Sequence, residues 1–150
     1  MGTKQLVEAA RIISKLAHKG QIDKQGFPYY LHPQTVASLV ETDEEKITAY
    51  LHDTLEDTEL KEADLRAVFG DEIMDAVRLL THDSRDSYMD YVRKISENRL
   101  ATVVKIADLT HNLDENRWST DELPDYLRRK RKECYLPAMK LLKESLDVDE

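Results

Sequence analysis

The run His52-Asp53-Thr54-Leu55-Glu56-Asp57 places one imidazole and three carboxylates close together in the sequence. On a helix that turns by about 100° per residue, with His52 as reference, Asp53 lies at about 100°, Glu56 at about 40° and Asp57 at about 140°. The opposite side carries apolar residues, namely Ile47, Leu51 and Leu55. Imidazole nitrogens and carboxylate oxygens bind divalent metals, and a neighbouring carboxylate can transfer a proton. The run therefore predicts hydrolase chemistry at a metal site, although a surface His-Asp pair on a helix is the simpler alternative for this motif alone.

A second polar group lies in the apolar segment from Val103 to Asn112. On a helix, Asn112 and Lys105 lie at about 40° and 60° from Asp108, so the three share one face. An aspartate in such a segment needs a partner, because burying an unpaired charge is costly. A metal would serve as that partner, and an ion pair with Lys105 is the alternative. His32, in a stiff aromatic loop before Pro33, is either a further ligand or a helix-capping histidine.

The composition limits the class of protein. A length of 150 residues, with 41% hydrophobic and 35% charged residues, predicts one globular domain over residues 1–150. A single cysteine, Cys134, excludes an intramolecular disulfide, and no apolar stretch approaches the ~20 residues of a membrane span. We therefore expect a cytoplasmic protein without a membrane partner. The net charge of −8 argues against polymeric nucleic acid as a partner, so the basic run Arg128–Lys132 is interpreted as solvated surface.

Helical periodicity predicts an all-α, bundle-like domain of about seven or eight helices with no strand. The first helix carries an apolar face from Leu6 to Ala17, and a second begins at Pro33. Thr42 is expected to cap a continuous central helix that runs to Asp57. The later helices are expected to end near Phe69, to run from 71 to 80, 88 to 96 and 99 to about 116, and to start again at 121–124 with a kink at Pro137.

Four segments together resemble the HD metal-dependent phosphohydrolases, and most closely the hydrolase domain of the stringent-response (RelA/SpoT-type) alarmone enzymes and their small stand-alone relatives. The segments are Ala17–Gln21, Gly26–Pro33, Leu51–Thr58 and Lys105–Asn112. Their order along the chain is that of the family. The combination is specific, whereas each segment alone is a weak signal.

The resemblance implies an HD-domain helical bundle with one Mn²⁺ ion held by His32, His52, Asp53 and Asp108. It implies an acid/base pair and contacts to a nucleotide. The acid/base pair would be Glu56 and Asp57, and the nucleotide contacts would be Lys24 and Asn112. Lys105, together with Lys24, is expected to offset charge that develops on the substrate.

The implied reaction is hydrolysis of a (p)ppGpp-type nucleotide at its 3′-pyrophosphate, releasing pyrophosphate. The chain ends at Glu150, so we expect no synthetase activity. Two positions depart from the family pattern, since Asp23 and Leu109 stand where basic residues are usual. The exact substrate and the base are therefore left open. Two alternatives remain: a broader HD nucleotide phosphohydrolase that removes a single phosphate, and a non-catalytic nucleotide- or metal-binding module. The Glu56-Asp57 pair argues against the binding module, because binding alone does not require proton-transfer carboxylates.

Overall fold

The computed structural model describes residues 2–114 and 125–148. The elements are α1 (Thr3–Ala17), α2 (Leu31–Ser38), α3 (Asp43–Leu51), α4 (Thr54–Asp57), α5 (Glu62–Phe69), α6 (Asp71–Leu80), α7 (Tyr88–Ser96), α8 (Arg99–Asn112), α9 (Asp125–Lys130), a π-helical turn (Arg131–Tyr135) and α10 (Leu136–Val148). The described residues contain no strand, only an isolated bridge between Ile22 and Pro28. The all-α prediction is thus confirmed. In the same part of the chain, no helix is both long and apolar enough to cross a membrane.

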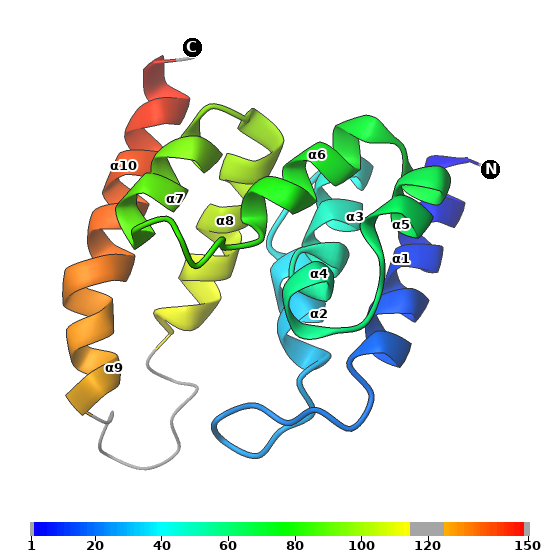
Figure 1. Ribbon diagram of the computed structural model, residues 1–150, viewed down its shortest axis with the longest axis horizontal. Helices are drawn as coiled ribbons and strands as arrows, with labels where there is room; N and C mark the ends of the chain where they lie inside the picture. The colour runs from blue at the N-terminus through cyan, green and yellow to red at the C-terminus, as the bar shows by residue number, and fades with distance from the viewer. Residues whose placement is uncertain (1, 115–124, 149–150) are drawn as a thin grey trace.

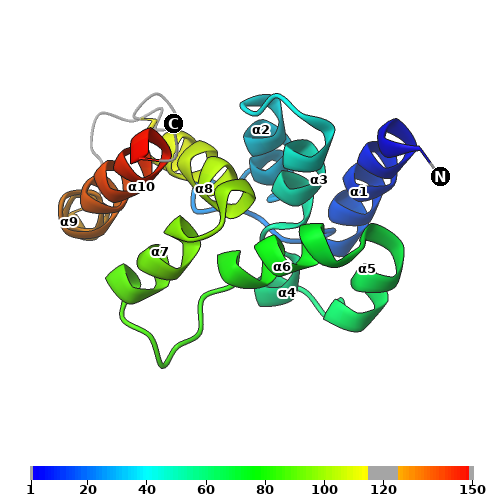
Figure 2. The same cartoon turned by 90° about the horizontal axis from the view of Figure 1, so that it is seen from above.

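Figure 1 shows how the helices are arranged. Two apolar clusters hold them together, and α3 and α6 contribute to both. One cluster joins α3 and α6 to α1 and α5, with Leu51 and Met74 fully buried. The other joins α2, α7, α8 and α10, with Val104 and Leu142 fully buried. Seen from above, α8 lies between the α2–α3 pair and α10 (Figure 2). The central helices α3 and α8 are therefore fixed by packing on several sides.

The central helix is shorter than predicted, and the expectation of one continuous helix to Asp57 is wrong. Thr42 does cap its start, since its Oγ1 accepts from the Glu45 amide at 3.1 Å. However, α3 ends at Leu51 and α4 begins only at Thr54. Side chains at the break bond to the backbone instead, because Thr54 Oγ1 donates to the Leu51 carbonyl at 2.7 Å. His52 and Asp53 consequently lie in a turn between two helices.

The end of the chain also differs from a simple helix. A π turn, closed by a hydrogen bond from the Leu136 amide to the Arg131 carbonyl, precedes Pro137. Proline has no amide hydrogen and crowds the carbonyl four residues before it, here that of Glu133, which disfavours α-helical geometry there. At the position of the kink predicted for Pro137, the described chain has this π turn followed by α10. The prediction that the helix from Arg99 continues to about residue 116 is wrong, because α8 ends at Asn112 and Leu113 caps it. The predicted helix start at 121–124 lies outside the described residues.

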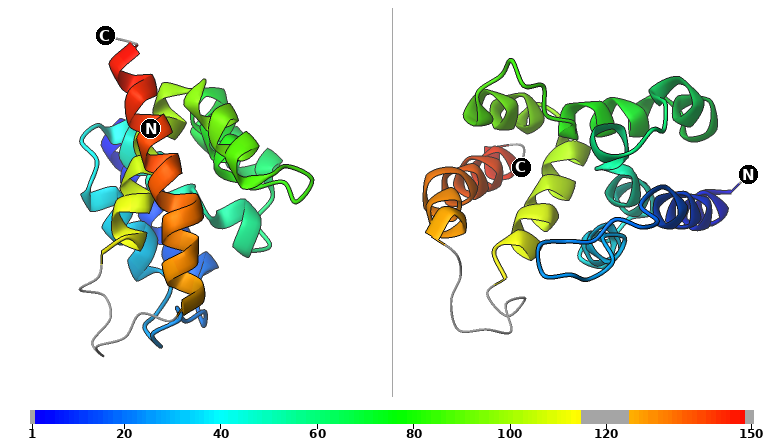
Figure 3. Two further views of the ribbon diagram at one scale, coloured as in Figure 1. Left: turned by 90° about the vertical axis from the view of Figure 1, so that its left-hand side faces the viewer. Right: turned by 60° about the horizontal axis from the view of Figure 1, so that its bottom comes forward.

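The loop from residue 18 to residue 30 connects α1 to α2 and approaches the C-terminal end of α8 (Figure 3). Its two arms are joined by the Ile22–Pro28 bridge, and the Asp23 amide donates to the Phe27 carbonyl at 2.8 Å. The Asp23 carboxylate closes the loop further, because its Oδ1 accepts from the amides of Gln25 and Phe27 at 2.9 and 3.0 Å. This loop carries Lys24 and leads directly to His32.

Candidate metal and active site

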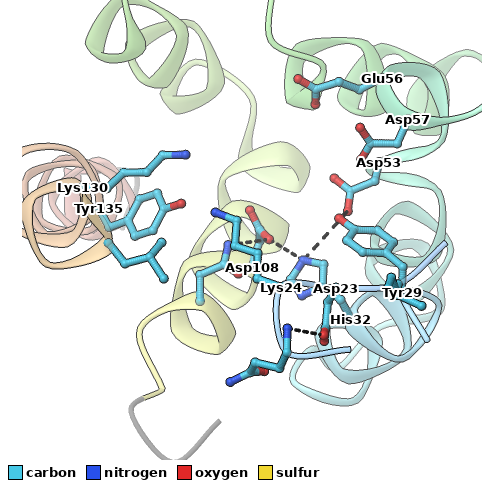
Figure 4. Close-up of a pocket in the computed structure, with 14 residues that line it drawn as sticks. Asp23, Lys24, Tyr29, His32, Asp53, Glu56, Asp57, Asp108, Lys130 and Tyr135 are labelled. Carbon is cyan, nitrogen blue, oxygen red and sulfur yellow. Dashed lines mark hydrogen bonds and ion pairs between the residues drawn. The ribbon is translucent and has the colours of Figure 1, made fainter. Parts of the chain in front are cut away.

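The four residues predicted to bind a metal come together from three separate segments. Figure 4 shows three of them, His32, Asp53 and Asp108. His32 lies in the first turn of α2, His52 and Asp53 in the α3–α4 turn, and Asp108 in α8. His32 Nε2 is 2.8 Å from Asp108 Oδ1, and His52 Nε2 is 3.1 Å from Asp53 Oδ2. One donor atom each of His32, His52 and Asp53 lies within 4.8 Å of the others. This spacing brings two imidazoles and two carboxylates around one point.

The histidine rings are oriented so that each points its Nε2 at the carboxylates. The Ala49 carbonyl lies 2.6 Å from His52 Nδ1, and because a carbonyl only accepts, Nδ1 carries the proton. The Nε2 atom of His52 is buried and lies 3.1 Å from Asp53 Oδ2, but it makes no well-formed hydrogen bond with the described residues. His32 Nδ1 lies 2.7 Å from His111 Nδ1, and the two rings stack. Such contacts on the far ring nitrogen are typical of metal-binding histidines.

Both carboxylates of the cluster are held by outer residues. Asp108 Oδ2 accepts from Lys105 Nζ at 2.9 Å, and its Oδ1 accepts from Asn112 Nδ2 at 3.3 Å. Tyr29 donates its hydroxyl to Asp53 Oδ2 at 2.5 Å. Each aspartate therefore arrives at the cluster with its orientation already fixed by a hydrogen-bond donor.

The electrostatics keep these carboxylates ionised. Burial acts to raise the pKa of Asp53, but the charge of the adjacent protonated His52 outweighs burial and lowers that pKa to about 2. Burial is likewise outweighed at Asp108, where Lys105 and the two histidines hold the pKa well below its usual range. Two ionised carboxylates and two imidazole Nε2 atoms form a donor set that fits a divalent ion of borderline hardness. The orphaned Nε2 of His52 supports the same conclusion.

A cavity of about 550 Å³ opens in front of the cluster. Among the described residues, its walls are formed by Ile22, Asp23, Lys24, Gln25, Tyr29, His32, Asp53, Glu56, Asp57, Asp108, Asn112, Leu127, Lys130 and Tyr135. The predicted acid/base pair and the predicted nucleotide contacts Lys24 and Asn112 are thus all cavity residues. This volume falls in the range of small-molecule sites.

The pKa values of the two cavity carboxylates on α4 are shifted upward. Burial and the neighbouring charge of Asp57 raise the pKa of Glu56, while burial and Asp53 raise the pKa of Asp57. Closely spaced carboxylates with raised pKa values are suited to holding and releasing protons near neutral pH.

Lys105, which was predicted to offset charge on the substrate, does not lie where a substrate could contact it. It is 9% exposed and does not belong to the described cavity wall; its ammonium group lies between Asp108 and the ring of Tyr91, 5.3 Å from the ring centroid. The ion pair with Asp108, which the sequence offered as an alternative, is therefore formed. Leu109 is fully buried in the core, which accounts for an apolar residue at that position.

The cavity residues that sequence reasoning missed include Tyr29, Lys130 and Tyr135. Tyr29 lies within the aromatic loop, and its only sequence signal for a role at the site was its position three residues before His32. Lys130 was hidden in the basic run, and Tyr135 had no motif. Both come from the segment that contains the π turn, whose one sequence signal is Pro137.

Known proteins resemble this chain in sequence over one part of their length. A GTP pyrophosphokinase of Myxococcus xanthus is 31% identical over 150 residues, covering 88% of this chain and 20% of that protein. A guanosine-3′,5′-bis(diphosphate) 3′-pyrophosphohydrolase of Haemophilus influenzae is 34% identical over 137 residues, covering 81% and 20%. The bifunctional (p)ppGpp synthase/hydrolase SpoT of Escherichia coli is 30% identical over 119 residues, covering 69% and 17%. The chain thus spans about a fifth of the length of these relatives.

The fold is shared with a solved structure as well. A metazoan ortholog of SpoT, described as hydrolysing ppGpp and as acting in starvation responses, matches with a TM-score of 0.70 at 22% identity. The match covers 94% of this chain and 85% of that one. No protein-family model matches the chain. The resemblance expected from the four segments is therefore confirmed, and by sequence and fold this chain is a relative of the RelA/SpoT-type alarmone enzymes.

Proposed function

We propose that this protein is a metal-dependent hydrolase of a phosphorylated nucleotide, and that it removes the 3′-pyrophosphate of a (p)ppGpp-type nucleotide as pyrophosphate. The observation that carries the proposal is the convergence of His32, His52, Asp53 and Asp108 at a cavity that also contains Glu56 and Asp57. The names of the Haemophilus and Escherichia relatives support the same reaction. We propose hydrolysis as the reaction of this site, because a metal site beside proton-transfer carboxylates is suited to the attack of water.

The proposed ion is Mn²⁺, held by the two imidazoles and two carboxylates, a donor set that suits it. When bound, such an ion polarises a phosphate oxygen and lowers the pKa of a coordinated water. Tyr29 and Lys105 would keep Asp53 and Asp108 in position through the hydrogen bonds described above. We therefore assign Lys105 an action through Asp108 and not a direct substrate contact.

The remaining cavity residues would orient the substrate and move protons. Glu56 and Asp57 would position the attacking water and take up its proton, since burial raises their pKa values toward neutrality. Lys24 would pair with a phosphate from the loop side, and Asn112 would donate or accept a hydrogen bond to the nucleotide from α8.

The decisive experiment is product analysis after incubation of Mn²⁺-loaded protein with ppGpp, with the double variant His52→Ala/Asp53→Ala as control. Equal amounts of pyrophosphate and GDP from the wild type alone are expected. Orthophosphate in place of pyrophosphate would indicate a phosphomonoesterase instead. If folded, Mn²⁺-loaded wild type binds ppGpp without turnover, and Glu56→Gln binds it equally well, the protein is a binding module and the proposal fails.

A further inference from the structure

The wall of the cavity opposite the metal cluster is built by the C-terminal segment. Leu127, Lys130 and Tyr135 line the cavity from α9 and the π turn. In Figure 4, Lys130 and Tyr135 face Lys24 and Asp108 across the open space. If the 3′ end of a nucleotide lies at the metal cluster, the rest of the nucleotide would lie between the wall with Lys24 and Asp108 and the wall with Lys130 and Tyr135.

The π turn explains why Lys130 and Tyr135 share this wall. Residues five apart lie about 140° apart around an α-helix and so face different ways. In the wider turn, whose hydrogen bond joins Arg131 to Leu136, residues five apart come closer to one face. The result is a contact between them, with Lys130 Nζ 5.8 Å from the centroid of the Tyr135 ring. The turn thus builds a cation–aromatic pair at the cavity.

The charge of the cavity gives this pair a role. Among the described residues that line it, five carry carboxylates and two, Lys24 and Lys130, carry ammonium groups. A bound divalent ion offsets part of the negative charge at one end only. Lys130 forms no ion pair with the residues that the structure describes, whereas Lys94 and Lys105 each have an aspartate. Its charge is therefore available at the end remote from the cluster.

The loop between α1 and α2 carries an acidic residue, Asp23, directly before the cavity residue Lys24. Asp23, beside Lys24, uses its carboxylate to bind the amides of Gln25 and Phe27 and so stabilises the loop. Among the residues of this loop that line the described cavity wall, Lys24 is then the only one with a cationic side chain. A second phosphate group of the substrate would need a cation from the opposite wall.

We propose that Lys130, presented by the π turn on the face of Tyr135, binds the 5′-phosphate end of the nucleotide and makes the site selective for substrates with phosphates at both ends. The inference rests on the proposed function, because it takes the 3′-pyrophosphate to lie at the metal cluster. Lys130 is a specificity-determining residue that acts on affinity. Charge-assisted contacts of this kind are stronger than neutral hydrogen bonds.

The test is calorimetric binding of two ligands to Mn²⁺-loaded protein that carries Glu56→Gln to prevent turnover. The ligands are ppGpp and guanosine 3′-diphosphate, which lacks the 5′-phosphates. Lys130→Gln is expected to weaken ppGpp binding by about tenfold and to leave guanosine 3′-diphosphate binding unchanged. Lys132→Gln is the matched control, since Lys132 is an exposed lysine in the π turn, two positions after Lys130 and outside the described cavity wall, and it should change neither affinity.

Four results would overturn the inference: no loss of ppGpp affinity in Lys130→Gln, an equal loss for both ligands, the same loss in Lys132→Gln, or no binding of ppGpp by the parent protein. A parallel turnover assay with Glu56 intact separates this inference from the proposed function. Binding that depends on Lys130 without hydrolysis would refute the hydrolase and retain the phosphate contact. Hydrolysis by the wild type, with unchanged ppGpp affinity in Lys130→Gln, would support the hydrolase and refute the phosphate contact of Lys130.

Discussion

Lys105 and Asp108 form a buried ion pair, with Nζ 2.9 Å from Oδ2 and side chains that are 11% and 7% exposed. Both residues lie on α8, three positions apart, so the helix itself holds them in register. The pair commits one oxygen of Asp108 and leaves Oδ1 directed at His32. A residue outside the described cavity wall thereby determines how a predicted metal ligand is presented.

Removing this lysine should destabilise the fold. Lys105→Met removes the cation that pairs with Asp108 Oδ2 in the interior, and we expect a loss of about 3–5 kcal/mol in the free energy of unfolding. Urea unfolding of the metal-free protein at neutral pH measures it. Lys94→Met, which removes an exposed partner of Asp86, should change stability little and serves as control. Equal effects of the two substitutions would contradict the structural role assigned to Lys105.

The hydrogen bond from Tyr29 to Asp53 should matter for metal affinity. Tyr29→Phe keeps the ring and removes only the hydroxyl that holds Asp53 Oδ2. Partners of this type commonly account for 10- to 100-fold in affinity, so Mn²⁺ binding measured by calorimetry is expected to weaken by about that factor. Tyr30→Phe is the control, because the Tyr30 ring instead lies under Lys15. Unaltered Mn²⁺ affinity in Tyr29→Phe would show that the hydroxyl has no such function.

Metal binding should also stabilise the fold measurably. Mn²⁺ at about 100 times its dissociation constant should raise the free energy of unfolding by about 2.7 kcal/mol, and a chelator should reverse the effect. The double variant His52→Ala/Asp53→Ala should not respond. His82→Ala removes a histidine outside the cluster and should respond as the wild type does. A response of the double variant equal to that of the wild type would mean that the ion binds elsewhere.

Alkaline pH should unfold the protein in part through Tyr91. Burial raises the pKa of Tyr91 to about 12, and its hydroxyl donates to the Leu80 carbonyl at 2.6 Å. In the unfolded chain the pKa of tyrosine is about 10, so the folded state holds the Tyr91 proton more tightly. The resulting contribution to the free energy of unfolding is complete below pH 10 and is lost as the pH rises toward 12.

This loss should amount to about 2–3 kcal/mol, measured by urea unfolding at a series of pH values. Tyr91→Phe should lower stability at neutral pH and flatten the decline between pH 10 and 12. Tyr126→Phe, at an exposed tyrosine, should leave the decline unchanged. The interpretation would be wrong if Tyr91→Phe lost stability with the same slope as the wild type.

The sequence was sufficient for the fold class and for the residues that gather at the cluster. His52 and Asp108 stand among apolar neighbours, and a buried polar group in such a context needs a partner. The turn at His52-Asp53 was not predictable, because the apolar period continues through it while the bonds that end α3 come from side chains. Helical periodicity predicted that Lys105 lies near Asp108. It could not predict whether the flexible lysine side chain contacts the Asp108 carboxylate or a bound substrate.

The far wall of the cavity lay beyond sequence patterns for a different reason. Lys130 and Tyr135 meet only because the helix widens before Pro137, and a rule based on α-helical spacing separates them. Their distance from the metal cluster depends on how α10 packs against α7 and α8. Such tertiary information is absent from local periodicity.

His32 and Asp108 are 76 positions apart in the chain, yet they meet at 2.8 Å. An ion bound by both, and by the α3–α4 turn, would act as a cross-link that closes a long loop, and closing long loops restricts the unfolded chain most. Its loss would be felt first in α2 and α8, while the cluster of α1, α5 and α6 has its own apolar contacts. On chelation, amide exchange should then quicken in α2 and α8 and change little in α1, α5 and α6, so that loss of the metal would appear first as local unfolding around the predicted metal ligands.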